Sequence, residues 1–152
     1  NQGMQPIAGY NFGARLFDRL IQVLKYTIFC GVTVTTIGFL AGQIFPQSLI
    51  CLFTSDETLT NIAVEGLRIV LIFFPVVGFQ MVTSSFFQSI GMAKKAIFLS
   101  LTRQLLFLIP SLLVFPSIWG TVGVWMSMPV ADGIATIVAA CMLRWQLKRL
   151  KA

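Results

Sequence analysis

The sequence predicts an all-α polytopic transmembrane helix bundle with four full spans. Apolar residues make up 57% of the chain and charged residues only 11%, whereas about a quarter of a soluble domain is charged. Four apolar stretches are each about 22 residues long, which at 1.5 Å per residue crosses a hydrocarbon core of roughly 30 Å. Basic residues gather on alternate connections between these stretches, which is typical of membrane topology.

The first predicted elements precede the spans. Residues 1–13 have the pattern of the last turns of a helix, and residues 14–25 form a basic amphipathic link suited to an anionic cytoplasmic membrane surface. The chain starts at Asn1 rather than at an initiator methionine, so we expect a C-terminal fragment of a longer protein. The transmembrane spans and the cytoplasmic tail that follow are predicted at residues 23–45, 69–90, 96–118, 122–143 and 144–152.

The distribution of positive charge predicts the orientation. The two connections on the other side of the membrane, residues 46–61 and 116–121, carry no Lys or Arg, and the first of them contains Asp56. By the positive-inside rule, both ends of the chain lie in the cytoplasm. The net charge of +6 is therefore an orientation signal, and we expect no nucleic-acid partner. Nine of the 11 basic residues fall on the inner connections and ends: Arg15, Arg19, Lys25, Lys94, Lys95, Arg144, Lys148, Arg149 and Lys151.

Residue types needed for catalysis or metal binding are missing from the pattern. The chain has no histidine, no glycine-rich phosphate loop and no pair of carboxylates within one span. Its three cysteines have no metal-binding or disulfide spacing and are expected to be free thiols. The sequence therefore predicts a protein that is not an enzyme, with no catalytic residue, metal site or resident cofactor.

Several residues predict how the helices pack and bend. Pro75, Pro110 and Pro129 lie inside three of the four spans and are expected to bend them. In the first span, small residues four apart predict close approach of a neighbouring helix. These small residues are Gly31 with Thr35 and Gly38 with Gly42.

Two ionisable residues lie within the spans rather than at their ends. Arg103 is roughly 12 Å along its helix from the inner end, and Asp132 is roughly 18 Å from the same side, at 1.5 Å per residue. Because the two helices are antiparallel neighbours, we expect the side chains to reach each other, and a bidentate pair would suit the guanidinium. Ionised groups inside a membrane usually face a partner, a cavity or an ion route.

Three roles for Asp132 stay open at the level of sequence. It forms a permanent clamp with Arg103, or it titrates alone and cycles a proton because desolvation raises its affinity for protons. Alternatively, Thr136, Ser127 or the backbone near Pro129 satisfies it. Only the second role makes Asp132 a coupling residue.

A polar face runs along the second span. Gln80, Ser84 and Gln88 recur every four residues past the Pro75 bend, and lipid cannot satisfy them. They either line a water-filled cavity for a solute or join helices through hydrogen bonds. Thr136 on the fourth span is a further candidate for lining such a cavity.

Short motifs in order along the chain carry a family resemblance. Residues 3–14 match the pattern G-x-Q-P-I-x-x-Y-N-x-G-A, and the chain resembles the multidrug and toxic compound extrusion (MATE) family, in which this segment ends the eighth helix. The resemblance covers essentially the whole chain. The other motifs are Phe53-Thr54 with Asp56, then Phe86 to Gly91, Ser100 to Gln104 with Pro110, and Pro129 to Asp132.

The resemblance implies part of a twelve-helix antiporter with two six-helix lobes. Residues 1–152 would be the partial C-terminal lobe, comprising the end of helix eight and helices nine to twelve. Such a protein lies in the cytoplasmic membrane and exports amphipathic, often cationic compounds by alternating access, driven by Na⁺ or H⁺. Its expected partners are membrane lipid, these substrates and the N-terminal lobe of the same protein.

The sequence departs from the family pattern in one respect. Some members carry an acidic residue in helix ten as part of a cation site, whereas residues 75–88 contain no Asp or Glu. Asp132 is the remaining membrane acid. Two other functions stay open: a lipid-linked oligosaccharide flippase, for which Arg103 would be the only basic cavity residue, and a helical scaffold subunit that transports nothing.

Overall fold

Helices account for nearly all of the computed structural model, which describes residues 1–151. Within that range no residue forms a β-strand, so the predicted all-α class is confirmed. The helical elements are α1 (Met4–Gly13), α2 (Phe17–Ile44), α3 (Pro46–Cys51), α4 (Glu57–Val70), η1 (Leu71–Phe73), α5 (Phe74–Ser89), α6 (Ala93–Leu101), η2 (Thr102–Leu108) and α7 (Ile109–Lys151).

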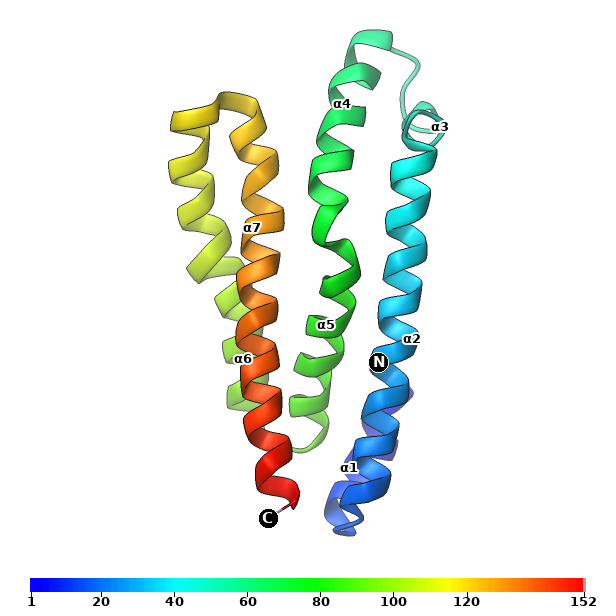
Figure 1. Cartoon of the computed structure of the whole chain (residues 1–152), viewed down its shortest axis with the longest axis vertical. Helices are drawn as coiled ribbons and strands as arrows, with labels where there is room; N and C mark the ends of the chain where they lie inside the picture. The colour runs from blue at the N-terminus through cyan, green and yellow to red at the C-terminus, as the bar shows by residue number, and fades with distance from the viewer. Residues whose placement is uncertain (152) are drawn as a thin grey trace.

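Four long rods lie side by side along the length of the molecule (Figure 1). The first is α2, and the second is α4, η1 and α5 in succession. The third contains α6, η2 and the start of α7, and the fourth is the rest of α7. The short helix α1 packs against α2 and α5 at the lower end of the view. Successive rods run in opposite directions, as successive membrane crossings of one chain must.

The turn between the third and fourth rods lies inside α7. Gly120 has φ 59° and ψ −135°, and the chain reverses direction there, at the yellow end of the bundle in Figure 1. A side chain would be strained at this positive φ, so glycine suits the reversal. By length and hydropathy, three helical stretches are fit to cross a membrane: Phe17–Ile44, Glu57–Ser89 and Ala93–Leu150. The reversal splits the third of these into two crossings, which gives the four predicted spans.

The helices extend beyond the predicted spans. Residues 14–25 were expected to form a separate link, but α2 starts at Phe17 and runs unbroken to Ile44. The break lies earlier, at Arg15, which has φ 57°. No proline interrupts residues 17–44, so the amphipathic stretch and the apolar span continue as one helix. The predicted tail is also helical, because α7 continues to Lys151.

The second rod begins well before the apolar segment that predicted it. Asp56 caps α4 by accepting hydrogen bonds from the backbone N–H groups of Thr58 at 2.8 Å and Leu59 at 3.3 Å. Carboxylates are favoured at this position because they satisfy orphan N–H groups and oppose the helix dipole. The predicted span 69–90 is thus the apolar part of a longer rod.

Irregular turns accompany two of the three prolines. The tight 3₁₀ turn η1 ends two residues before Pro75, which occupies the first turn of α5. The widened π-helical segment η2 ends two residues before Pro110. Proline has no N–H to donate, so a carbonyl in the preceding turn loses its α-helical hydrogen bond. The backbone there departs from regular α-helical geometry. Pro129 lies inside α7, within the fourth rod.

Small residues of α2 allow it to pack closely against the second rod, as their spacing predicted. The nearest neighbours of Gly31 are Val82 and the backbone of Gly78, and Thr35 donates a hydrogen bond to the carbonyl of Pro75 at 3.1 Å. Further along the helix, Gly38 faces Phe74 and Gly42 faces Leu71. Backbones that approach this closely gain packing contacts, which drive helix association in lipid.

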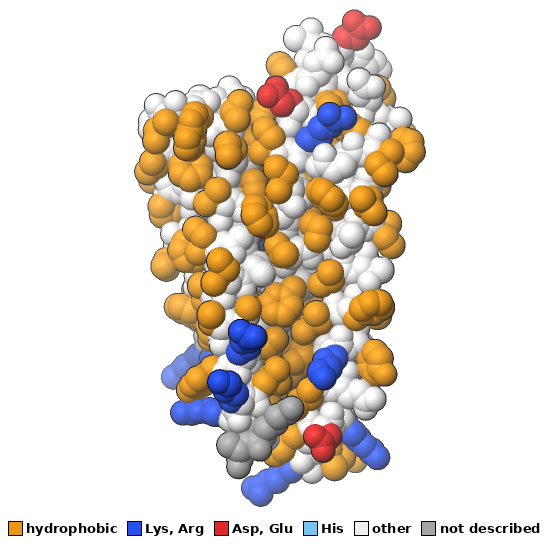
Figure 2. Space-filling view, in the orientation of Figure 1, with side chains coloured by type: hydrophobic (Ala, Val, Ile, Leu, Met, Phe, Trp, Pro, Cys, Tyr) orange, Lys and Arg blue, Asp and Glu red, His pale blue; other side chains and the backbone are white. Residues whose placement is uncertain are grey.

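The buried core lies toward the end of the bundle that holds α1. Its members come from α1, α2, α5, α6 and α7, and the largest of them, Phe86 and Phe87, are fully buried. Most other large apolar side chains remain exposed along the rods. Figure 2 shows this apolar surface over the middle of the bundle and Lys and Arg side chains gathered at the lower end. Such a surface is suited to lipid or to a partner lobe, not to water.

The close α2–α5 crossing predicts the effect of enlarging Gly78. A Cβ atom there would lie 2.6 Å from Thr35 Oγ1 and 2.8 Å from the carbonyl oxygen of Gly31. Gly78→Ala should therefore destabilise the purified protein by about 1–3 kcal/mol through overpacking. Thermal unfolding in detergent measures this change. Gly13→Ala is the matched control, because a Cβ at Gly13 meets nothing within 4 Å. Equal stability of the two variants would show that the crossing is looser than described.

Candidate functional site

Arg103 lies on the irregular segment of the third rod. It is the second residue of η2, whose π-helical turns are wider than those of α6 before it. π-Helical segments occur mostly as single widened turns within α-helices, and they are frequent at functional sites. The segment packs against α7 in the fourth rod. The widened turn therefore carries a charged side chain toward the antiparallel neighbour.

Asp132 lies on the fourth rod in a row of small side chains. Ser127, Ala131, Ala135 and Ala139 are each no more than 1% exposed, and they recur at intervals of four residues. This row lets α7 approach its neighbours closely. Asp132 follows Ala131 directly and is 7% exposed. The carboxylate is thus held between tightly packed helices.

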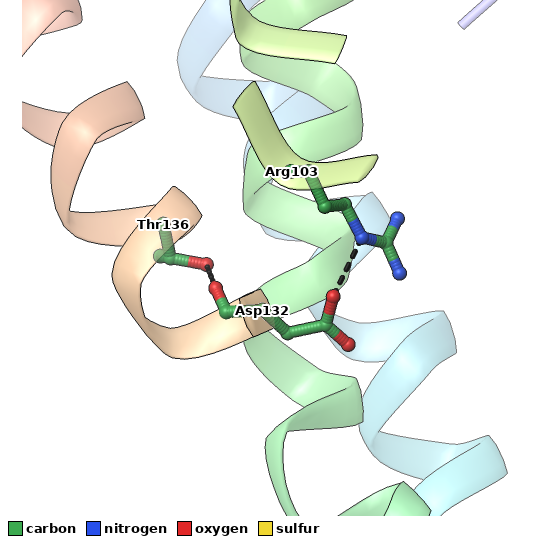
Figure 3. Close-up of polar contacts among 3 residues, drawn as sticks. All are labelled: Arg103, Asp132 and Thr136. Atoms are coloured by element: carbon green, nitrogen blue, oxygen red, sulfur yellow. Dashed lines mark hydrogen bonds and ion pairs between the residues drawn. The ribbon is translucent and has the colours of Figure 1, made fainter. Parts of the chain in front are cut away.

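The two predicted membrane charges meet. Arg103 Nε lies 2.5 Å from Asp132 Oδ1, as Figure 3 shows. The side chain of Asp132 is 10% exposed and that of Arg103 is 34% exposed. An ion pair in a poorly solvated environment compensates both charges, each of which would otherwise be costly in lipid. The contact joins the third and fourth rods near their middle.

The pair is not bidentate, contrary to the expectation from the guanidinium fork. Only Nε contacts the carboxylate, and the two terminal nitrogens of Arg103 point away from it in Figure 3. Thr136 donates to the backbone carbonyl of Asp132 at 2.7 Å, and Ser127 donates to the carbonyl of Gly123. Neither hydroxyl reaches the carboxylate of Asp132, whose side-chain partner is Arg103.

Two cavities adjoin the ion pair. The first has a volume of about 270 Å³ and contains both charges in its wall. The second, called the polar groove below, has a volume of about 480 Å³ and contains Arg103 but not Asp132. Arg103 and Gln104 line both. The polar groove is lined by Asn1, Gln80, Met81, Ser84, Ser85, Gln88, Ser100, Arg103 and Gln104.

The polar face of the second span lines this groove. Gln88 is exposed, and Gln80 is only 4% exposed, with an Oε1 atom that has no hydrogen-bond partner in the described residues. Ser84 donates to the carbonyl of Ala96 at 3.3 Å and lies 3.3 Å from the hydroxyl oxygen of Ser100. The face therefore joins α5 to α6 through Ser84 and also borders a cavity, while the predicted role of that cavity in holding a solute stays a prediction. Thr136 is absent from the lining of both cavities.

Two features of the polar network were not identified from sequence. Ser100 and Gln104 join the groove from the third rod, and their spacing of four residues on one helical face was the available signal. At the inner end, Lys95 Nζ donates to Gln146 Oε1 at 2.6 Å and lies 4.7 Å from the ring centroid of Trp145. That contact holds the lower ends of the third and fourth rods together, below the ion pair.

The fold is that of a multi-pass membrane protein with an ion pair between its helices and a polar groove beside that pair. The model of the MatE family matches residues 1–113, which is well over half of the chain. The chain belongs to the MatE family of multidrug efflux transporters, so the resemblance seen in the sequence is confirmed.

Individual relatives agree with this assignment. The multidrug export protein MepA of Staphylococcus aureus strain N315 is 22% identical over 138 residues, which cover 91% of this chain and 30% of MepA. The structure of the MATE multidrug transporter DinF-BH shares 35% sequence identity and a TM-score of 0.88. That match covers 94% of this chain and 32% of DinF-BH. The chain thus spans about a third of the length of these relatives.

Two further structures show the same fold in different states. An outward-facing conformation of a MATE family transporter matches with a TM-score of 0.90, and an inward-facing conformation matches with 0.88. Both are 24% identical and cover 97% of this chain, which covers 34% and 35% of them, respectively. This part of the fold is therefore similar in both conformations.

The ion pair predicts a non-additive response to mutation. Arg103→Met alone leaves the Asp132 carboxylate buried without a partner and should cost about 3–5 kcal/mol of stability. Combining it with Asp132→Leu removes both charges and should recover most of that loss. Thermal unfolding of the purified variants in detergent measures both values. A double variant no more stable than Arg103→Met would mean that the two side chains act independently.

Proposed function

We propose that this chain forms part of the C-terminal lobe of a cation-coupled antiporter. The protein exports amphipathic or cationic compounds across the cytoplasmic membrane in exchange for inward Na⁺ or H⁺. The observation that carries the proposal is membership of the MatE family, together with 35% identity to the transporter DinF-BH over 94% of this chain. Membrane lipid and the remaining lobe of the same protein are its structural partners.

Alternating access is the proposed mechanism. A lobe that rocks against its partner must keep its own fold while the opening of the central site changes sides. The near-equal match of this chain to an outward-facing and an inward-facing transporter supports such rigid-body motion. In this mechanism the α2–α5 crossing and the buried core hold the lobe together. The polar face of the second rod lines the groove.

The proposed orientation follows from charge. Lys94, Lys95 and the basic residues of the last turns of α7 lie at the end of the bundle that holds α1, whereas Asp56 and Glu57 lie at the opposite end. The positive-inside rule then places α1 and the end of α7 in the cytoplasm. A substrate would leave toward the end marked by α3 and the start of α4.

Asp132 is the proposed coupling residue of this lobe. A cation moves the equilibrium between facing states only if it binds them with different affinity. Asp132 contacts Arg103 on the other rod of the same hairpin and lines a cavity of about 270 Å³. Protonation or cation binding at the carboxylate would weaken its contact with Arg103 and alter that cavity.

Dye efflux from cells or proteoliposomes tests the transport function. The full-length protein should expel a lipophilic cationic dye, and efflux should fall at least tenfold when the driving gradient is removed. Removing Na⁺ and collapsing the proton gradient in separate arms identifies the coupling ion. Efflux at the rate of protein-free vesicles in every arm would contradict the proposed function.

Asp132→Asn is the matched variant for the coupling role. The amide keeps the size and a hydrogen bond to Arg103 but cannot carry a proton or bind a cation as a carboxylate does. Gradient-driven efflux should fall at least tenfold at equal protein level in the membrane. Asp18→Asn at the exposed start of α2 is the control and should leave efflux unchanged. Normal gradient-driven efflux by Asp132→Asn would exclude a coupling role.

A further inference from the structure

We propose that the polar groove binds the carboxylate, or another strong hydrogen-bond acceptor, of an amphipathic substrate, with the terminal nitrogens of Arg103 as the donors. This inference rests on the proposed transport function and names a chemical class of substrate within it. The substrates concerned are zwitterions, which carry an acidic group together with their cationic or apolar part. Two observations carry the proposal.

The first observation is the incomplete use of Arg103. The guanidinium has five N–H donors, and the hydrogen bond to Asp132 comes from Nε alone. Within residues 1–151, neither terminal nitrogen donates a hydrogen bond to protein, and both point away from the carboxylate (Figure 3). The two terminal nitrogens, called the fork below, are therefore free of protein partners in that range. A guanidinium binds a carboxylate through two parallel hydrogen bonds from such a pair of N–H groups.

The second observation is the separation of the two charges between the cavities. Arg103 lines the polar groove, but Asp132 lines only the smaller cavity on its other side. Among the described residues, no carboxylate lines the groove and Arg103 is the one charged side chain there. A cationic ligand has no counter-charge in this space. An anionic group finds one, together with the side-chain amide N–H groups of Gln104.

Asp132 positions Arg103 for this task rather than competing with the ligand. Its contact fixes the guanidinium through Nε and offsets the cost of keeping a cation inside the membrane. Lysine at this position would still pair with Asp132, but its ammonium is a single point of charge without a second, outward-facing edge.

A pair of dyes that differ by one charge tests the proposal. The probes are a xanthene dye with a free carboxylate and its ethyl ester, and their binding to the full-length protein in nanodiscs is measured by fluorescence anisotropy. Arg103→Lys should weaken binding of the acid about tenfold, which is the effect of losing one charge-assisted hydrogen bond of about 1.4 kcal/mol, and should change binding of the ester less than twofold. Arg68→Lys in the last turn of α4, where the side chain is exposed, is the control.

A second variant tests the proposal independently if Arg103→Lys does not fold. Gln104→Glu keeps the size of the side chain and puts a negative charge into the groove beside the fork, so the acid should bind at least tenfold more weakly and the ester more tightly. Equal loss of both dyes in the two variants, or unchanged binding of the acid, would overturn the proposal. Because binding is measured without a gradient, this result is separate from the efflux assay, whose failure would contradict transport instead.

Discussion

The Arg103–Asp132 ion pair is the interaction on which the arrangement of the third and fourth rods depends. Neither charge can face lipid alone at low cost, so the two helices must lie where a guanidinium and a carboxylate meet. The fourth rod meets this condition with a row of small residues that includes Ala131 and Ala135, and the third with the widened turn η2. The cavities on either side of the pair follow from the same irregular packing.

The buried core and the polar groove lie beside one another. The buried core gathers toward the end that holds α1, where Phe86 and Phe87 pack together and Lys95 bonds to Gln146. The groove borders the same stretch of α5, because Ser84, Ser85 and Gln88 line it. A well-packed core next to the groove suits a lobe that keeps its own fold, which the proposed alternating access requires.

Much of the fold could be predicted from sequence, because hydropathy shows which segments lie in a membrane and charge shows on which side their connections lie. The four spans and the depth match between Arg103 and Asp132 follow from counting residues along straight helices. The single Nε contact could not be predicted, since it depends on how η2 rotates the side chain. The predicted spans are shorter than the helices because apolar windows detect only the part in lipid, whereas Asp56 starts α4 by hydrogen bonding in an exposed region. The polar face left two uses open, and the structure places Ser84 both in a hydrogen bond to α6 and in the wall of the groove.

Thiol accessibility tests the central claim, that a water-filled groove lies beside an ion pair inside the membrane. Ser84→Cys, placed in the full-length protein with its native cysteines replaced, should react with a membrane-impermeant maleimide added to inside-out vesicles or to whole cells. Leu106→Cys, on the exposed apolar surface of the third rod, should stay unreacted from both sides. Equal protection of both cysteines in every preparation would contradict the account, because the groove would then be closed to water.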